Sequence, residues 1–300
     1  MSTNKKAYLA LAYVCFIWGT TYMAIRIGVM HYPPFLFAGT RQAISGLILG
    51  GFALYMNKNV DFSLKNLSVQ ALIGFLMLTM SNGMVTYGEI TVPSGAAALI
   101  CSLMPIFAVL FNLAGPKKEK VNTNILLGLA LGTVGVILIF RQNLADLSNP
   151  GYITGMLAIL SANATWALGS IINRKNTKAQ NPMLNSGLQL FFGGVFMLII
   201  SPAVDDYSHL EVNRDGLIAL VYLIIFGSVL AYGLYMYSLQ HLPVSVATIY
   251  AYINPLVAVI LGYFLMSEPL NWYTFFAFIA ILTSVLLVKK GNNKKQKSST

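Results

Sequence analysis

Ten apolar stretches take up most of this sequence, and they limit the folds open to it more than any other feature. Each is about 17 to 25 residues long, which is enough to cross a bilayer as a helix. They cover residues 8–28, 34–56, 68–90, 93–113, 124–140, 151–173, 183–203, 216–239, 243–266 and 271–288. Charged residues make up only 9 % of the chain, too few to cover a water-soluble surface. The sequence therefore predicts an all-α integral membrane protein with ten transmembrane helices.

The distribution of Lys and Arg predicts how these helices are oriented. If the N-terminus is inside, the inner segments hold fifteen basic residues, the outer side holds Arg26, Arg141 and Arg214, and Arg41 lies within a span. Such an excess of Lys and Arg marks the cytoplasmic side. We therefore expect a multi-pass protein with both termini in the cytoplasm. The basic tail, residues 289–300, is expected to contact membrane lipid and not nucleic acid.

The two halves of the chain resemble each other. At offsets of 148 to 150 residues, matching positions include Trp18 with Trp166, Arg26 with Arg174, Pro93 with Pro243, and Pro105 with Pro255. Because each half has an odd number of spans, the second copy must insert upside down relative to the first. We therefore expect two inverted five-helix repeats, residues 7–141 and 150–288, followed by the basic tail.

The matching prolines indicate where helices are interrupted. A proline inside a helix removes one backbone hydrogen bond and bends the helix. Paired interrupted helices line the binding site at the repeat interface of many transporters. We expect helix kinks at Pro93, Pro105, Pro243 and Pro255. Helix packing alone is the alternative, since prolines are tolerated in membrane helices generally.

A set of motifs spread over the chain resembles a known family. The set consists of Trp18-Gly-Thr in the first span, Arg41 in the second, Pro93-Ser-Gly-Ala-Ala-Ala at the start of the fourth, Asn254-Pro in the ninth, and Glu119 and Glu268 after the fourth and ninth. Together these motifs resemble the EamA family of the drug/metabolite transporter superfamily over residues 7–288. The resemblance implies an inverted-repeat carrier of the bacterial inner membrane, commonly an exporter of amino acids and related metabolites. It does not name a substrate.

The sequence offers little chemistry beyond transport. It contains no Walker-type phosphate loop and no His, Glu or Cys pair at metal-ligand spacing, so we expect no ATP hydrolysis, metal, cofactor or enzyme activity. No carboxylate lies in the middle of a span, where proton-coupled carriers usually place one. Facilitated diffusion therefore fits better than proton coupling. Glu89, near the outer end of the third span, leaves antiport open.

Polar and aromatic side chains at mid-depth mark a candidate site. Asn163, Trp166 and Ser170 share one face of the sixth span, and Trp18 occupies the equivalent place in the first. Arg41 costs free energy inside a membrane, so we interpret it either as an anchor for a substrate carboxylate or as a side chain that reaches the headgroups. The predicted substrate-binding residues are Trp18, Tyr22, Arg41, Asn82, Asn163, Trp166, Tyr232, Tyr250 and Asn254. Packing is the alternative role for each of them.

Together these patterns predict a carrier that exports amino acids or related small metabolites by alternating access of its halves. A multidrug or other metabolite exporter of the same fold is the alternative. A membrane scaffold without transport would not need the polar set at mid-depth. A monomer is compatible with this pattern, and the oligomeric state is left open.

Overall fold

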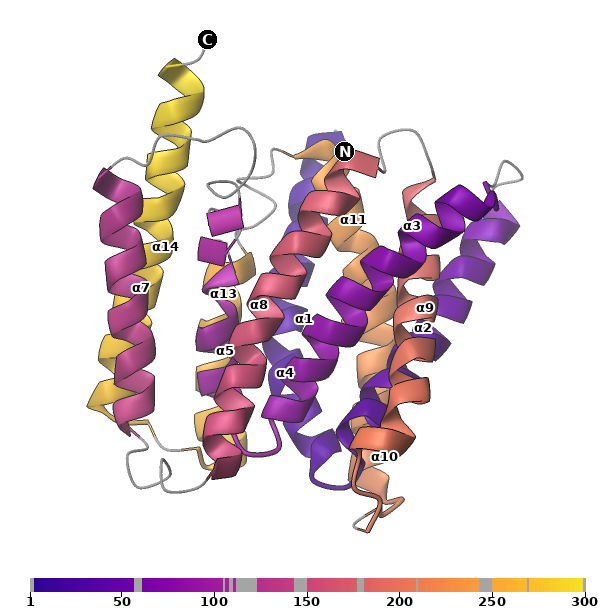
Figure 1. Ribbon diagram of the computed structural model, residues 1–300, viewed down its shortest axis with the longest axis horizontal. Coiled ribbons are helices and arrows are strands. Elements are labelled where there is room, and N and C mark those ends of the chain that lie inside the picture. Colours follow the sequence, from indigo (N-terminus) through magenta and orange to yellow (C-terminus); the bar gives the residue numbers. More distant parts are fainter. Residues whose placement is uncertain are drawn as a thin grey trace.

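A computed structural model of the protein shows a bundle of helices (Figure 1). It describes residues 3–56, 61–104, 106–107, 110–111, 123–142, 150–176, 181–208, 210–242, 250–268 and 270–298. The helices found there are α1 (Thr3–Val29), α2 (Pro34–Met56), α3 (Leu64–Gly74), η1 (Phe75–Asn82), α4 (Gly83–Gly88), α5 (Ser94–Cys101), α7 (Thr123–Gln142), α8 (Pro150–Asn176), α9 (Pro182–Val204), α10 (Arg214–Tyr222), η3 (Leu223–Leu230), α11 (Ala231–His241), α13 (Tyr250–Met266) and α14 (Trp272–Ser298).

These helices form ten rods within the described ranges, because α3, η1 and α4 are continuous and so are α10, η3 and α11. Five rods precede residue 143 and five follow residue 149. By length and hydropathy, five helices can cross a membrane: Lys5–Val29, Leu64–Gly88, Pro150–Asn173, Pro182–Val204 and Arg214–Ser238. Shorter apolar helices accompany them, and the described segments contain no strand. The predicted all-α membrane fold is confirmed.

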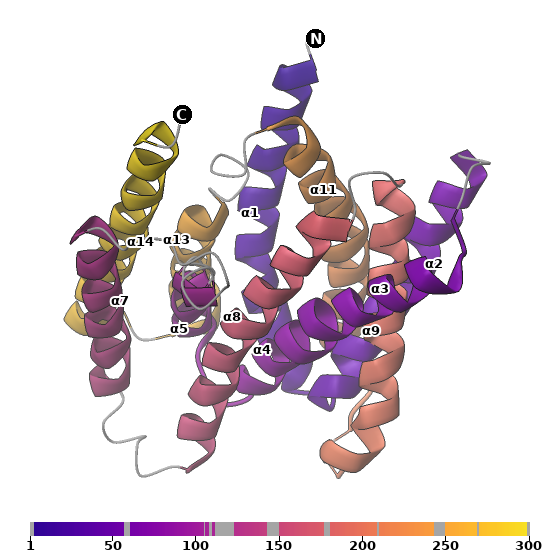
Figure 2. The same cartoon turned by 45° about the horizontal axis from the view of Figure 1, so that its top comes forward.

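The rods pack in pairs that repeat across the two halves. The pair α2 and α9 lies at one edge of the bundle and the pair α7 and α14 at the other (Figures 1 and 2). Between them, α1 packs against α13 and the rod α10–α11, while α8 packs against α5 and the rod α3–α4. The start of α1 and the end of α14 lie on the same face of the bundle, here called the termini-bearing face.

Two π-helical segments are equivalent in the two repeats. η1 begins at Phe75 and η3 at Leu223, which is the 148-residue offset that also relates Trp18 to Trp166. A π-helix bonds i to i+5 and is found frequently at functional sites, because its wider turn redirects side chains and carbonyl groups. Neither segment was predicted from the sequence, where each is part of an apolar helical stretch.

Glycines allow α2 and α9 to lie in direct backbone contact. A Cβ atom added at Gly46 would lie 2.3 Å from the backbone nitrogen of Phe191, and one added at Gly194 would lie 2.2 Å from that of Ala43. Backbone atoms cannot rotate away as side-chain atoms can. Small residues serve membrane helices in this way, because lipid offers no hydrophobic force to hold helices together.

Carboxylates that follow one helix cap the start of another. Glu268, just after α13, accepts hydrogen bonds from the backbone nitrogens of Ser94 (2.7 Å) and Gly95 (3.1 Å) at the start of α5. Asp205, just after α9, accepts in the same way from Phe35 (3.2 Å) and Leu36 (2.8 Å) at the start of α2. The first nitrogens of a helix have no partner inside it, and its positive end favours an anion. Both acids thus join distant spans.

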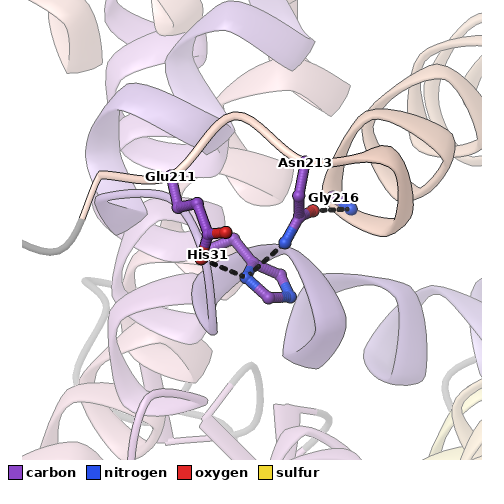
Figure 3. A network of polar contacts seen from close by, with 4 residues as sticks. All are labelled: His31, Glu211, Asn213 and Gly216. Carbon is purple, nitrogen blue, oxygen red and sulfur yellow. Dashed lines mark hydrogen bonds and ion pairs between the residues drawn. The ribbon is translucent and has the colours of Figure 1, made fainter.

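A smaller polar network connects His31, Glu211, Asn213 and Gly216 (Figure 3). The Asn213 side chain accepts from the nitrogen of Gly216 (2.8 Å) and so caps α10, while its amide nitrogen lies 2.6 Å from Nδ1 of His31. The Glu211 carboxylate is 3.9 Å from the same ring nitrogen. These contacts fix the turn after α1 against the segment that leads into α10.

Of the four predicted kinks, two fall on described residues. Pro93 directly precedes α5 as its N-cap residue, so it starts that helix, and Pro255 lies inside α13. The described helix α5 ends at Cys101, four residues before Pro105. Pro105 and Pro243 themselves lie outside the described residues.

Candidate functional site

A cavity of about 120 Å³ lies between the two halves of the bundle. Its walls come from α1, α2, η1, α4 and α5 of the first half and from α8, α9, η3, α11 and α13 of the second. All of the predicted substrate-binding residues line it: Trp18, Tyr22, Arg41, Asn82, Asn163, Trp166, Tyr232, Tyr250 and Asn254. The structure therefore brings the predicted set to one place, while their contact with substrate stays a prediction.

Arg41 provides the charge of the cavity. Its side chain is only 4 % exposed, and Nε donates to the Ser228 hydroxyl at 2.9 Å. Within the described part of the chain, Nη1 is buried without a hydrogen-bond partner. No other charged side chain is found among the described residues that line the cavity. Arg41 is thus a cavity-lining cation with one enclosed, unsatisfied donor, a costly arrangement unless another group completes it.

Arg41 is held by polar neighbours that do not neutralise it. Ser228 donates to Oε1 of Gln42 at 3.4 Å, and Nε2 of Gln42 donates to Oδ1 of Asn82 at 3.2 Å. This short chain joins α2, η1 and η3. It orients the guanidinium through neutral partners, and the buried carboxyl of Glu89, which follows α4, interacts with Arg41 electrostatically.

An aromatic cluster forms another part of the wall. The centroid of the Trp18 ring lies 4.8 Å from the ring centroid of Tyr250, 5.0 Å from that of Tyr235 and 6.3 Å from that of Trp166. The Trp18 indole donates to the carbonyl of Gly227 in η3 at 3.1 Å, so its ring is fixed. Aromatic faces can stack with a flat substrate or attract an ammonium group.

Other predicted residues have structural partners. Asn163 donates to the carbonyl oxygens of Ile100 (3.0 Å) and Ile159 (3.3 Å), which ties α8 to the end of α5. In the amide orientation that satisfies its neighbours, Asn254 donates to the carbonyls of Tyr250 and Cys15, each at 2.9 Å. Tyr232 donates to Gln189 at 2.7 Å. These three residues position the walls of the cavity as well as lining it.

Comparison with known proteins decides the family. The profile of the EamA-like transporter family matches residues 5–141 and, a second time, residues 153–289. The chain belongs to the EamA-like transporter family. The "Uncharacterized inner membrane transporter YedA" of Escherichia coli K12 is 36 % identical over 94 % of this chain and 90 % of its own length. This EamA-like protein is thus a membrane transporter, and the family and its relatives' names point away from an enzyme.

More distant relatives also match this EamA-like protein over nearly its whole length. The "Uncharacterized transporter YvbV" of Bacillus subtilis is 25 % identical over 99 % of this chain and 95 % of its own. The "WAT1-related protein At3g02690, chloroplastic" of Arabidopsis thaliana is 26 % identical over 93 % of this chain and 68 % of its own. A solved crystal structure matches with a TM-score of 0.66 at 16 % identity over 99 % of both chains, a likeness of fold alone.

Glu89 of this EamA-like transporter lies outside the cavity wall. It directly follows α4 and is fully buried, and its two carboxylate oxygens have no hydrogen-bond partner within the described ranges. Arg26 donates instead to the backbone carbonyls of Glu89 and Ile90. Arg26 therefore caps the end of α4 from the last turn of α1.

Two of the cavity residues that were not predicted in this EamA-like transporter are Gln42 and Ser228. Gln42 and Ser228 are 1 % and 2 % exposed and hold Arg41 and Asn82 in place. Gln42 is adjacent to Arg41 in the sequence, and Ser228 is an isolated polar residue in an apolar run. The π-helical turn of η3 places Ser228 opposite Arg41, and the sequence analysis contained no signal for that turn.

Proposed function

We propose that the protein is a carrier for small carboxylate-bearing metabolites, amino acids first among them, which it exports by alternating access. The unpartnered Nη1 of Arg41 is the observation that carries this proposal. A substrate carboxylate would accept from it, and charge-assisted hydrogen bonds of this kind are the strong ones. The aromatic cluster around Trp18 would receive the ammonium group or an apolar side chain.

The size of the cavity supports a small substrate over a drug. A volume of about 120 Å³ is below the several hundred Å³ that are typical of drug-sized pockets. A multidrug exporter of the same fold is therefore the second candidate, and a scaffold without transport is the third. A counterflow assay in proteoliposomes tests all three, using a panel of amino acids, neutral metabolites and cationic drugs. Counterflow of none of them, by protein that remains folded, would contradict the carrier proposal.

We also place the transporter in the cell (inner) membrane with both termini in the cytoplasm. The basic residues concentrated on one side support this orientation, as does the position of the start of α1 and the end of α14 on one face. A C-terminal alkaline phosphatase fusion is expected to be inactive, because the enzyme needs the periplasm, while a C-terminal green fluorescent protein fusion should fluoresce. An active phosphatase would contradict this orientation.

Trp166→Phe should weaken substrate binding without loss of the fold. The change keeps a ring but removes part of the aromatic wall, and aromatic contacts contribute about 0.5 to 1.5 kcal/mol each. We expect the half-saturation concentration in counterflow to rise roughly two- to tenfold. The same substitution at Trp272, which is 74 % exposed, is the matched control. An equal effect of both variants would mean that Trp166 acts only through packing.

A further inference from the structure

A line of buried amide side chains connects the cavity to the termini-bearing face. Tyr232, in the cavity wall, donates to Oε1 of Gln189 at 2.7 Å, and Nε2 of Gln189 donates to Oε1 of Gln70 at 2.7 Å. Nε2 of Gln70 donates to Oδ1 of Asn66 at 2.9 Å. Nδ2 of Asn66 donates to the backbone oxygen of Asp61, before the start of α3, at 2.8 Å. We call Asn66, Gln70 and Gln189 the amide ladder.

The amide ladder is enclosed by protein. Asn66 is 4 % exposed, Gln70 is 0 % and Gln189 is 1 %. They belong to α3 and α9, which pack together closely enough that a Cβ added at Gly74 would lie 2.5 Å from the carbonyl oxygen of Gln189. Buried polar groups lose their contacts with water, so such a line is costly to build where apolar residues could pack instead.

We propose that the amide ladder lines the route by which substrate passes between the cavity and the termini-bearing face. In the present conformation the ladder is closed, because its amides bond to one another. When α3 and α9 separate, the bond between Gln189 and Gln70 breaks, so Oε1 of Gln70 becomes free to bind water and the polar groups of a passing solute, whereas the bond from Gln70 to Asn66 lies within α3 and is kept. The proposal deepens the carrier function proposed above and rests on it.

The side chains of the amide ladder suit weak, transient contact with a solute more than tight binding of it. Its members are neutral, with both donors and acceptors, so they can bind a carboxylate and an ammonium in turn without holding either firmly. Conduction requires binding that is favourable enough to enter and weak enough to leave. The ladder therefore fits polar, zwitterionic or uncharged solutes.

The repeat gives the ladder a counterpart on the other side of the cavity. At the 148-residue offset, Gln189 of α9 is equivalent to Arg41 of α2. Each residue sits in the α2–α9 pair and bonds to a neighbouring rod that contains a π-helix: Arg41 to Ser228 of η3, and Gln189 to Gln70, one turn before η1. Arg41, the charged residue of the two, lines the cavity, whereas the neutral Gln189 belongs to the amide ladder. Substrate would thus be bound at Arg41 and released along the amide ladder.

Thiol labelling tests the route without any substrate. The background carries Cys15→Ala and Cys101→Ser, which removes both native thiols. Gln70→Cys is compared with Ile73→Cys, one turn away on α3 and equally buried at 0 %. A membrane-impermeant methanethiosulfonate reagent is applied to vesicles of either orientation. We expect Gln70→Cys to react at least about tenfold faster than Ile73→Cys, and only from the termini-bearing face, since an open minor state exposes the route alone.

Equal rates for the two thiols, or reaction of Gln70→Cys from the opposite face, would overturn the route and make the ladder a support between helices. If Gln70→Cys does not accumulate as folded protein, Asn66→Cys replaces it against the same Ile73→Cys control. Labelling as expected in a protein that transports nothing in the counterflow panel would place the failure in the proposed function and leave the route standing.

Discussion

Replacing Arg41 by Gln is expected to abolish most transport of carboxylate-bearing substrates while leaving neutral ones nearly unchanged. A hydrogen bond to a charged group contributes about 1.5 to 3 kcal/mol, so the half-saturation concentration should rise roughly ten- to hundredfold. Because Arg41 also interacts with the buried carboxyl of Glu89, the unfolding temperature of the variant is measured beside its transport. Counterflow with matched acid and amide forms of one substrate, such as an amino acid and its amide, measures the difference.

The control for this variant is Arg214→Gln, which removes an exposed arginine from the first turn of α10. It should leave transport of both forms unchanged. If Arg41→Gln weakens the acid and the amide equally, Arg41 supports the cavity wall and does not bind the carboxylate. A loss of folded protein would show instead that the chain of Arg41, Ser228 and Gln42 holds the helices together.

Gly46→Leu should prevent the two halves from packing. The new side chain would begin 2.3 Å from the backbone nitrogen of Phe191, so α2 and α9 would have to separate along their whole contact. Overpacking of a core typically costs about 1 to 3 kcal/mol, and more when backbone and not side chain must move. We expect most of the protein to be lost from the monodisperse peak in size-exclusion chromatography, and a lower unfolding temperature for the remainder.

Gly51→Leu is the matched control, because nothing lies within 4 Å of a Cβ at this exposed position of the same helix. It should accumulate like the parent protein. Normal accumulation of Gly46→Leu would contradict the close contact of α2 with α9.

Hydropathy was enough to predict the rods, because a membrane allows only a helix of sufficient apolar length at each such stretch. The placement of Trp18, Trp166 and Tyr250 in one cavity was also predictable, since the depth of a residue in its span follows from counting and the repeat aligns the two halves. The bonds that orient these residues were not. The amide of Asn163 donates to the carbonyl of Ile100, and Glu268 caps α5 from a distant part of the chain. Such partners depend on how the rods pack.

The π-helices were beyond sequence reasoning for a different reason. Phe75–Asn82 and Leu223–Leu230 have little sequence in common, and each reads as an ordinary apolar helical stretch. Whether such an eight-residue stretch takes the wider π-helical turn is decided by tertiary packing, which local composition does not contain. The position of Ser228 opposite Arg41 could therefore not be foreseen.

The matching π-helices also carry information about ancestry. Two independent origins would have had to place the same rare deformation at the same offset from the same tryptophan, in segments that differ at most positions. Inheritance from one ancestral half is the simpler history. The deformation of the third helix thus belongs to the repeat unit itself, and duplication carried it to both sides of the cavity.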